Sequence, residues 1–251
     1  MKPAANLSLL WQELPYLDRF DAAAQAGFKA VEVLFPYDVP VADTKAACVS
    51  NGLELILINA PPLAPAGQSR GFAAVPESVQ TFRKDMVRAF RYAEALDARF
   101  VHVMAGNALG DAAFETFCRN LVWAAKSAPD GLTLTIEPLN PVAMPGYFLN
   151  DYGLAKRVLD EVSMKNVGLQ YDSYHAQMIH GDAIETFETY RADIVHVQIG
   201  DTPDRGTPGS GDVDFAGLFT AMAGAGYDGW ISGEYTPGPK TEDSLNWMKM
   251  L

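Results

Sequence analysis

A regular alternation of two kinds of segment constrains the fold of this chain more than any other feature. Short runs of apolar or alternating residues, typical of buried strands, are separated by longer stretches with apolar residues at helical spacing. Eight such pairs divide 251 residues into units of about 31 residues each. This repeat predicts a single (β/α)8 TIM barrel, in one domain over residues 1–251, with strands at residues 5–10, 30–35, 53–59, 99–104, 132–137, 167–172, 194–199 and 229–234.

A doubly wound open sheet is the competing architecture, and the first predicted turn argues against it. Such sheets normally have a glycine-rich turn after the first strand, whereas the segment LSLLWQELP contains no glycine. No linker rich in proline, glycine or serine divides the chain. The long irregular segment 59–78 follows the third predicted strand, and in a barrel we expect it to form a loop and lid on the catalytic face.

The charge balance and the cysteines restrict the partners and the compartment. Acidic residues number 31 against 19 lysines and arginines, for a formal net charge of −12. Because phosphate neutralisation needs clustered basic residues, we expect no nucleic-acid partner, while a small anionic substrate in a locally charged cleft is compatible with this balance. Cys48 and Cys118 lack metal-type spacing and are expected to be buried free thiols. With no segment apolar enough for a membrane helix or a signal peptide, we expect a cytoplasmic protein without a membrane partner.

Side-chain parity places polar residues at the ends of the last four predicted strands. Successive side chains of a strand point to opposite faces, so Thr135 and Glu137 share one face. By the same rule the polar faces of the next three strands end in Asp172, Gln198 and Glu234. The gaps of 35, 26 and 36 residues are each close to one strand and helix unit. We therefore expect these side chains to converge at the carboxyl ends of the fifth to eighth strands, which is the catalytic end of such barrels.

The converging carboxylates predict a metal site. Three carboxylates in one place repel one another and lose hydration unless a cation compensates them. An all-oxygen set with three anionic members suits a hard divalent ion, Mg²⁺ or Mn²⁺, better than Zn²⁺. Pro138 favours an extended backbone at Glu137 and ends that strand. The alternative is that these polar groups satisfy one another or helix N-termini without a metal.

Other polar residues near these strand ends are candidates for substrate contact. His175 lies three residues after Asp172, and Arg205 lies seven residues after Gln198. His102 lies near the end of the fourth predicted strand. A packing role is the alternative for both histidines. Glu32 lies early in its strand and is expected to fill the barrel interior.

These motifs resemble those of the xylose-isomerase-like barrel superfamily and, within it, of the hydroxypyruvate isomerase family. The matching segments span nearly the whole chain and are NLSLLW, GFKAVEVLFPY, VHVMAG, TIEPLN, DSYHAQ, HVQIGDTPDRGTPGSGDVDF and GEYTPG. The resemblance implies that a divalent metal is bound by Glu137, Asp172, Gln198 and Glu234. It also implies that Glu137 and Glu234 form the acid/base pair. Related sugar epimerases have histidine where Gln198 stands.

The activity that the resemblance implies is an aldose–ketose type of isomerisation. It would interconvert hydroxypyruvate and tartronate semialdehyde through an enediol, with a proton passing between the two glutamates. His175 and Arg205 fall where relatives hold substrate oxygens, and His102 is a further candidate. Arg205 would bind the substrate carboxylate, with Arg70 as a second candidate. The segment PPLAPAGQSRG and the residues after Arg205 depart from the family pattern at the expected substrate rim.

Other functions remain alternatives at this point. The chain could isomerise or epimerise another small keto acid or ketose, such as a 2-oxo-tetronate, or it could be a non-catalytic barrel that binds a metabolite. A related group of barrels cleaves abasic DNA with three zinc ions and several additional histidines, whereas this chain has only four histidines. A homo-oligomer is compatible with the sequence.

Overall fold

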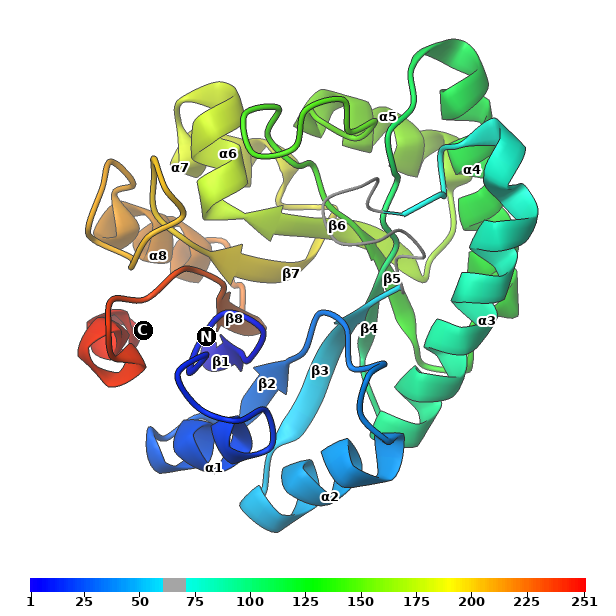
Figure 1. Cartoon of the computed structure of the whole chain (residues 1–251). Helices are drawn as coiled ribbons and strands as arrows, with labels where there is room; N and C mark the ends of the chain where they lie inside the picture. The colour runs from blue at the N-terminus through cyan, green and yellow to red at the C-terminus, as the bar shows by residue number, and fades with distance from the viewer. Residues whose placement is uncertain (61–70) are drawn as a thin grey trace.

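The computed structural model describes residues 1–60 and 71–251, and its centre is a closed barrel of parallel strands (Figure 1). The strands follow one another around the barrel in chain order, and β1 pairs with both β2 and β8. The predicted TIM barrel is therefore confirmed. The strands are β1 (Lys2–Asn6), β2 (Ala30–Glu32), β3 (Glu54–Asn59), β4 (Phe100–His102), β5 (Thr133–Ile136), β6 (Val167–Asp172), β7 (Ile194–Ile199) and β8 (Trp230–Gly233).

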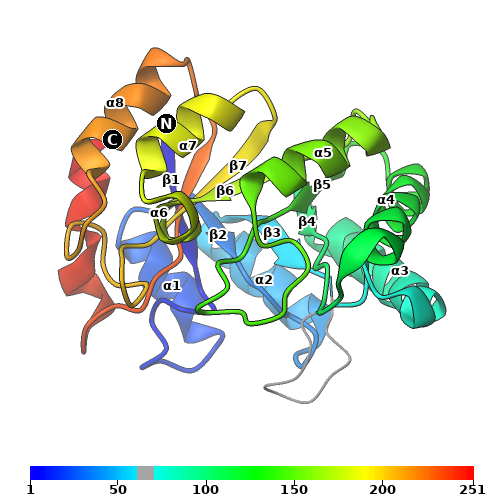
Figure 2. The same cartoon turned by 90° about the horizontal axis from the view of Figure 1, so that it is seen from above.

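Helices surround the barrel, as two views at right angles show (Figure 1, Figure 2). One α-helix follows most strands, while two short helices, α6 and α7, follow β6. The α-helices are α1 (Asp18–Gln25), α2 (Val41–Asn51), α3 (Val79–Leu96), α4 (Gly110–Ser127), α5 (Tyr152–Val162), α6 (Ser173–His180), α7 (Ala183–Tyr190) and α8 (Phe215–Gly224), and the 3₁₀ segments are η1 (Pro76–Ser78) and η2 (Thr241–Met250).

The first strand differs from its predicted position. The alternating run at residues 5–10 predicts a strand there, but β1 ends at Asn6. The side-chain oxygen of Asn6 accepts a hydrogen bond from the backbone N–H of Ser8 (3.0 Å). Its backbone oxygen accepts from Leu9 and Leu10 (3.1 and 2.9 Å). The prediction of a strand over residues 5–10 is therefore wrong beyond Asn6, because this asparagine turns the chain out of the sheet.

Side-chain parity separates the core outside the barrel from a polar layer inside it. Leu134 and Ile136 of β5 are fully buried in the apolar core that also includes Leu121 of α4. Burial of such a side chain contributes about 1.5–3 kcal/mol. Thr135, between them, points into the barrel, where its hydroxyl donates to Gln170 (2.7 Å). The interior therefore carries polar side chains beneath the strand ends.

Other expectations from the sequence have different outcomes. Cys48 and Cys118 are buried free cysteines, as predicted. In the described part of the chain, no helix combines the length and the apolar character needed to cross a membrane. Half of the segment 59–78, where a lid is expected, consists of residues 61–70, which lie outside the described residues and include Arg70.

Candidate active site

The carboxyl ends of β5 to β8 bring four polar residues to one mouth of the barrel. Asp172 is the last residue of β6, and Gln198 of β7 is its partner in register. Glu137 and Glu234 directly follow β5 and β8. Each of the four is at most 4% exposed. The mouth therefore gathers three carboxyl groups and one amide in a site that is shielded from water.

An interior amide, that of Gln170, links two of these residues. Gln170 Nε2 donates to Glu137 Oε2 (3.0 Å) and to Gln198 Oε1 (2.7 Å). Its own oxygen accepts from the hydroxyl of Thr135. Both ends of the amide are thus held, so Gln170 fixes the positions of Glu137 and Gln198 relative to each other. Parity indicates that Gln170 faces inward, but its role appears only when β5 and β7 lie on either side of β6.

Glu32 fills the barrel interior, as the sequence predicts. It is fully buried and accepts from Gln198 Nε2 (2.8 Å) and from Asn6 Nδ2 (3.1 Å). It also contacts His196 Nε2. Because a carboxylate accepts hydrogen bonds, the amide nitrogen of Gln198 must face Glu32. The amide oxygen of Gln198 is thereby turned toward Gln170, from which it accepts a hydrogen bond (2.7 Å).

Arg205 brings positive charge to the mouth from the loop that follows β7. Its guanidinium donates to Asp172 and lies 3.0 Å from Glu234 Oε1. Its backbone has φ 55°, in the left-handed region, and its carbonyl accepts from the N–H of Thr236 (2.8 Å). Its Nε has no hydrogen-bond partner among the described residues. One face of the guanidinium is therefore held by carboxylates, while an N–H remains to donate to another group.

Asp201 organises the loop that carries Arg205. It is fully buried, and Oδ1 accepts from the backbone N–H groups of Thr202 (2.8 Å) and Val213 (3.1 Å). Oδ2 accepts from those of Gly209 (2.9 Å) and Gly211 (2.8 Å). Four donors on one carboxylate close the loop into a fixed shape. This residue was not a candidate from the sequence, because its role depends on how the loop folds back.

His175 is held as a hydrogen-bond donor toward the site. Its Nδ1 accepts from the backbone N–H of Asn140 (3.0 Å) and faces the side-chain nitrogen of the same residue (2.9 Å). Burial lowers the pKa of His175 to about 3, so the ring is neutral and its proton lies on Nε2. Nε2 is 3.9 Å from Glu137 Oε1 and has no hydrogen-bond partner among the described residues. The geometry suits a contact to a substrate oxygen.

His102 and Asn59 extend the polar ring to β4 and β3. They are partners in register at the ends of these strands. His102 Nδ1 lies 3.5 Å from Glu137 Oε2. The two side chains are 2% and 4% exposed. Asn59 is a further residue that the sequence reasoning did not single out, although it ends the third predicted strand.

The two glutamates of the mouth have pKa values above the ordinary value of a glutamate. Burial raises the pKa of Glu137 well above its ordinary value, and the nearby Glu234 and Asp172 raise it further. Burial also raises the pKa of Glu234, to about 8, although Arg205 opposes this rise. Glutamates with raised pKa values can hold and release a proton near neutral pH.

The donor set fits a divalent cation. Glu137, Asp172 and His175 each place a potential ligand atom within 4.8 Å of the other two, while Glu234 lies beside Arg205. Because His175 is held as a donor, the oxygen atoms are the better ligands. Glu137 Oε1 and Glu234 Oε2 are buried without a hydrogen-bond partner in the described ranges. Three carboxyl groups also exceed the charge of one guanidinium.

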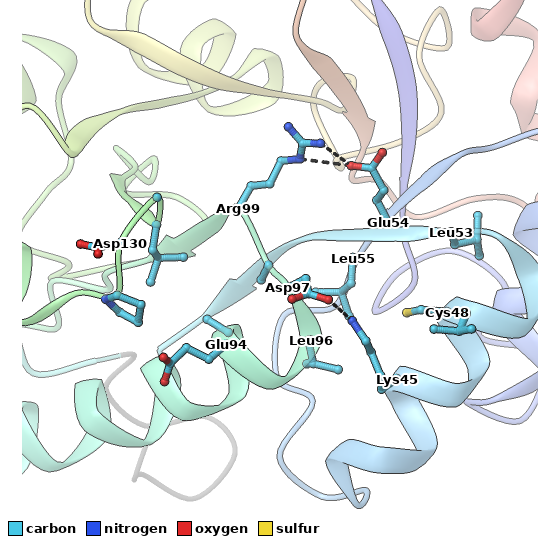
Figure 3. A pocket seen from close by; sticks show the side chains of 16 residues that line it. Lys45, Cys48, Leu53, Glu54, Leu55, Glu94, Leu96, Asp97, Arg99 and Asp130 are labelled. Atoms are coloured by element: carbon cyan, nitrogen blue, oxygen red, sulfur yellow. Dashed lines mark hydrogen bonds and ion pairs between the residues drawn. The ribbon is translucent and has the colours of Figure 1, made fainter.

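A hollow of about 820 Å³ lies at the opposite end of the barrel, next to the first residues of β3 and β5 (Figure 3). Its cationic groups are paired, Lys45 with Asp97 and Arg99 with Glu54. Exposed ion pairs of this kind contribute little to stability or to recognition. None of the predicted site residues lies there.

Comparisons with known proteins agree with the sequence motifs. Residues 20–251 match the family model described as xylose isomerase-like TIM barrel. The 2-oxo-tetronate isomerase of Cupriavidus necator is 41% identical and is matched over 98% of this chain and 96% of that protein. The hydroxypyruvate isomerase of Escherichia coli is 37% identical, over 98% and 97% of the two chains.

Solved structures give the same picture of the fold. A protein described as an AP endonuclease, family 2, from Brucella melitensis is 40% identical and superposes with a TM-score of 0.95 over 99% of this chain and 98% of that chain. The 3-keto-D-glucoside 4-epimerase of Escherichia coli is 21% identical, with a TM-score of 0.81 over 100% of both chains, and shares the fold. The comparisons confirm the resemblance that the sequence motifs indicated.

Proposed function

We infer that this chain, which belongs to the xylose isomerase-like TIM barrel family, is an isomerase of a small 2-oxo acid. The reaction that we propose interconverts hydroxypyruvate and tartronate semialdehyde. The observation that carries this proposal is the pair of buried glutamates, Glu137 and Glu234, which follow β5 and β8 at one mouth of the barrel. In a proton transfer between neighbouring carbons, one carboxylate can remove a proton and a second carboxyl group can supply one.

Arg205 supports an acidic substrate. Its guanidinium is fixed by Asp172 and Glu234, and its Nε–H is left to donate. A substrate carboxylate placed against this edge would be anchored next to one of the two glutamates. The planar guanidinium suits carboxylates better than a lysine ammonium does.

In the proposed reaction C3 of the acid loses a proton and C2 gains one. One glutamate removes a proton from the hydroxymethyl carbon of hydroxypyruvate, and the resulting enediol receives a proton at the former carbonyl carbon from the other glutamate. The aldehyde forms as the C3 hydroxyl loses its proton and the C2 oxygen gains one. The Nε2–H of His175 is placed to donate to one of these oxygens.

A divalent cation is part of the proposal. Glu137, Asp172, Gln198 and Glu234 would hold it through oxygen atoms, which favours Mg²⁺ or Mn²⁺ over Zn²⁺. When bound, such an ion polarises a carbonyl group and makes the neighbouring C–H more acidic. Gln170 and Glu32 would keep the Gln198 oxygen directed to the ion.

Three rival functions differ in what they would require. A four-carbon 2-oxo acid fits the same chemistry, and three relatives, among them the protein of Cupriavidus necator, are named 2-oxo-tetronate isomerase. Cleavage of abasic DNA would require a basic surface, which a net charge of −12 disfavours. A non-catalytic metabolite-binding barrel would have no need for two buried glutamates at the mouth.

Turnover of hydroxypyruvate by purified protein, with Mn²⁺ or Mg²⁺ added, tests the proposal. Glu137→Gln and Glu234→Gln should each lower kcat by about 10²- to 10⁴-fold, which is the usual contribution of a general acid or base. Glu188→Gln, at an exposed position in α7, is the matched control and should keep the wild-type rate. Near-normal turnover by either active-site variant would refute the proton-transfer assignment.

A further inference from the structure

Asn59 and His102 form a pair of buried polar side chains with atoms that have no hydrogen-bond partner among the described residues. Asn59 Oδ1 and both ring nitrogens of His102 have no hydrogen-bond partner within residues 1–60 and 71–251. Asn59 Nδ2 has only a long contact to Met104 Sδ (3.9 Å). A buried polar group without a partner is costly, so such groups together indicate a place where a ligand supplies the missing bonds.

The chemistry of the pair matches a neutral hydroxyl group. The imidazole ring of His102 has two nitrogens, and in its neutral form one donates a hydrogen bond and the other accepts one. The amide of Asn59 likewise offers an acceptor and donors. A hydroxyl group can both donate and accept a hydrogen bond. A carboxylate can only accept, so it would be repelled by Asn59 Oδ1 and by the nearby Glu137.

The strand order places this pair across the mouth from Arg205. Asn59 and His102 end β3 and β4, whereas Arg205 contacts residues at the ends of β6 and β8. Glu137, at the end of β5, lies between the two groups in strand order and 3.5 Å from His102. A substrate whose carboxylate is at Arg205 therefore directs its other end toward β3 and β4.

We propose that Asn59 and His102 form a subsite for the terminal hydroxyl of a four-carbon 2-oxo acid. The proposal rests on the function inferred above and deepens it, because it assigns the residues that distinguish a four-carbon from a three-carbon substrate. Hydroxypyruvate is one carbon shorter and leaves this subsite to water. On this inference the four-carbon acid is a second substrate beside hydroxypyruvate, and only the longer acid uses the hydrogen bonds of Asn59 and His102.

The test compares kcat/KM for hydroxypyruvate and for a four-carbon 2-oxo acid with hydroxyl groups on C3 and C4. Asn59→Leu keeps the side-chain volume but removes the amide, and it should lower kcat/KM for the four-carbon acid by about 10- to 100-fold. The value for hydroxypyruvate should stay within about threefold, because that substrate makes no bond there. Asn59→Ser, a smaller change, should shift the ratio in the same direction.

The controls separate this inference from the proposed function. Asn246→Leu changes an exposed asparagine of η2 and should leave the ratio of the two kcat/KM values unchanged. An equal loss for both acids in Asn59→Leu and Asn59→Ser, or an unchanged ratio, would overturn the subsite. Wild-type protein that converts hydroxypyruvate alone would also overturn it, whereas wild-type protein that converts neither acid would overturn the proposed function.

Discussion

Replacement of Asp201 by asparagine should disturb stability and substrate binding together. The carboxylate accepts four backbone N–H groups, two on each oxygen. In Asp201→Asn one oxygen becomes an NH₂ group, which cannot accept and instead faces two N–H donors. If Oδ1 keeps its two bonds, those lost are the bonds from Gly209 and Gly211.

The magnitude follows from the number and exposure of these bonds. A hydrogen bond to a charged group contributes about 1.5–3 kcal/mol, so two of them set an upper limit of about 3–6 kcal/mol. Gly209 and Gly211 are exposed residues, so their N–H groups can reach water after a small shift of the loop. We therefore expect a loss of about 2–3 kcal/mol, and a Tm lower by about 4–12 °C for a chain of this size.

The loss should extend to substrate binding because Asp201 acts through Arg205. The backbone N–H and C=O groups of Asp201 bond to those of Gly206, directly after Arg205. A less ordered loop would hold Arg205 less firmly, and Arg205 would bind a substrate carboxylate more weakly. KM should therefore rise about tenfold while kcat changes less. Combining Asp201→Asn with Arg205→Met should add little to the KM of Arg205→Met alone.

Thermal unfolding and steady-state kinetics measure the two effects. Asp182→Asn is the matched control, because the Asp182 side chain accepts one backbone N–H at the start of α7 and is exposed. A Tm of Asp201→Asn equal to that of the wild type would refute the calculation. A lower Tm without a change in KM would refute the link from the loop to the substrate.

Three further predictions follow from the interior, the surface helices and the metal ligands. Glu32→Ala removes the acceptor for Gln198 and should destabilise the fold by about 3–5 kcal/mol, measured by denaturant unfolding, with weaker Mn²⁺ binding in calorimetry. Burial raises the pKa of Asp85 to about 6, so the folded state favours the protonated carboxyl group. The protein therefore keeps its full stability below about pH 4 and loses part of it as the pH rises through about 6. Asp85→Asn should raise Tm at about pH 8 and not at about pH 4. A chelator should abolish turnover, and Mn²⁺ or Mg²⁺ should restore it better than Zn²⁺; activity that survives complete metal removal would contradict the proposed metal role.

The barrel and the location of its polar mouth could be read from the sequence because both depend on local periodicity. The alternation of strands and helices follows from apolar spacing, and the inward direction of Glu137 or Glu234 follows from parity within a few residues. The first strand was placed wrongly because its apolar alternation continues past Asn6, where a side-chain hydrogen bond turns the chain. The apolar pattern alone does not show that this hydrogen bond competes with continuation of the strand.

The supporting residues could not be found in the same way because their roles join distant segments. Gln170 bridges side chains from two other strands, and Glu32 binds a residue 166 positions away. Asp201 depends on a loop that returns its backbone N–H groups to one carboxylate. Contacts between residues so far apart in the sequence form because closure of the barrel fixes the register between distant strands.

The hydrogen bond from Gln198 to Glu32 has a consequence for the metal ligand that we propose at position 198. Glu32 requires a donor from the residue above it and places no other demand on that residue. A neutral histidine meets the same demand, because one ring nitrogen can donate downward while the other presents a lone pair to the mouth. The interior carboxylate of Glu32 can therefore accept a hydrogen bond from either glutamine or histidine at position 198. Gln198→His should preserve the fold while changing the ligand from oxygen to nitrogen, so metal preference could be altered by a single substitution.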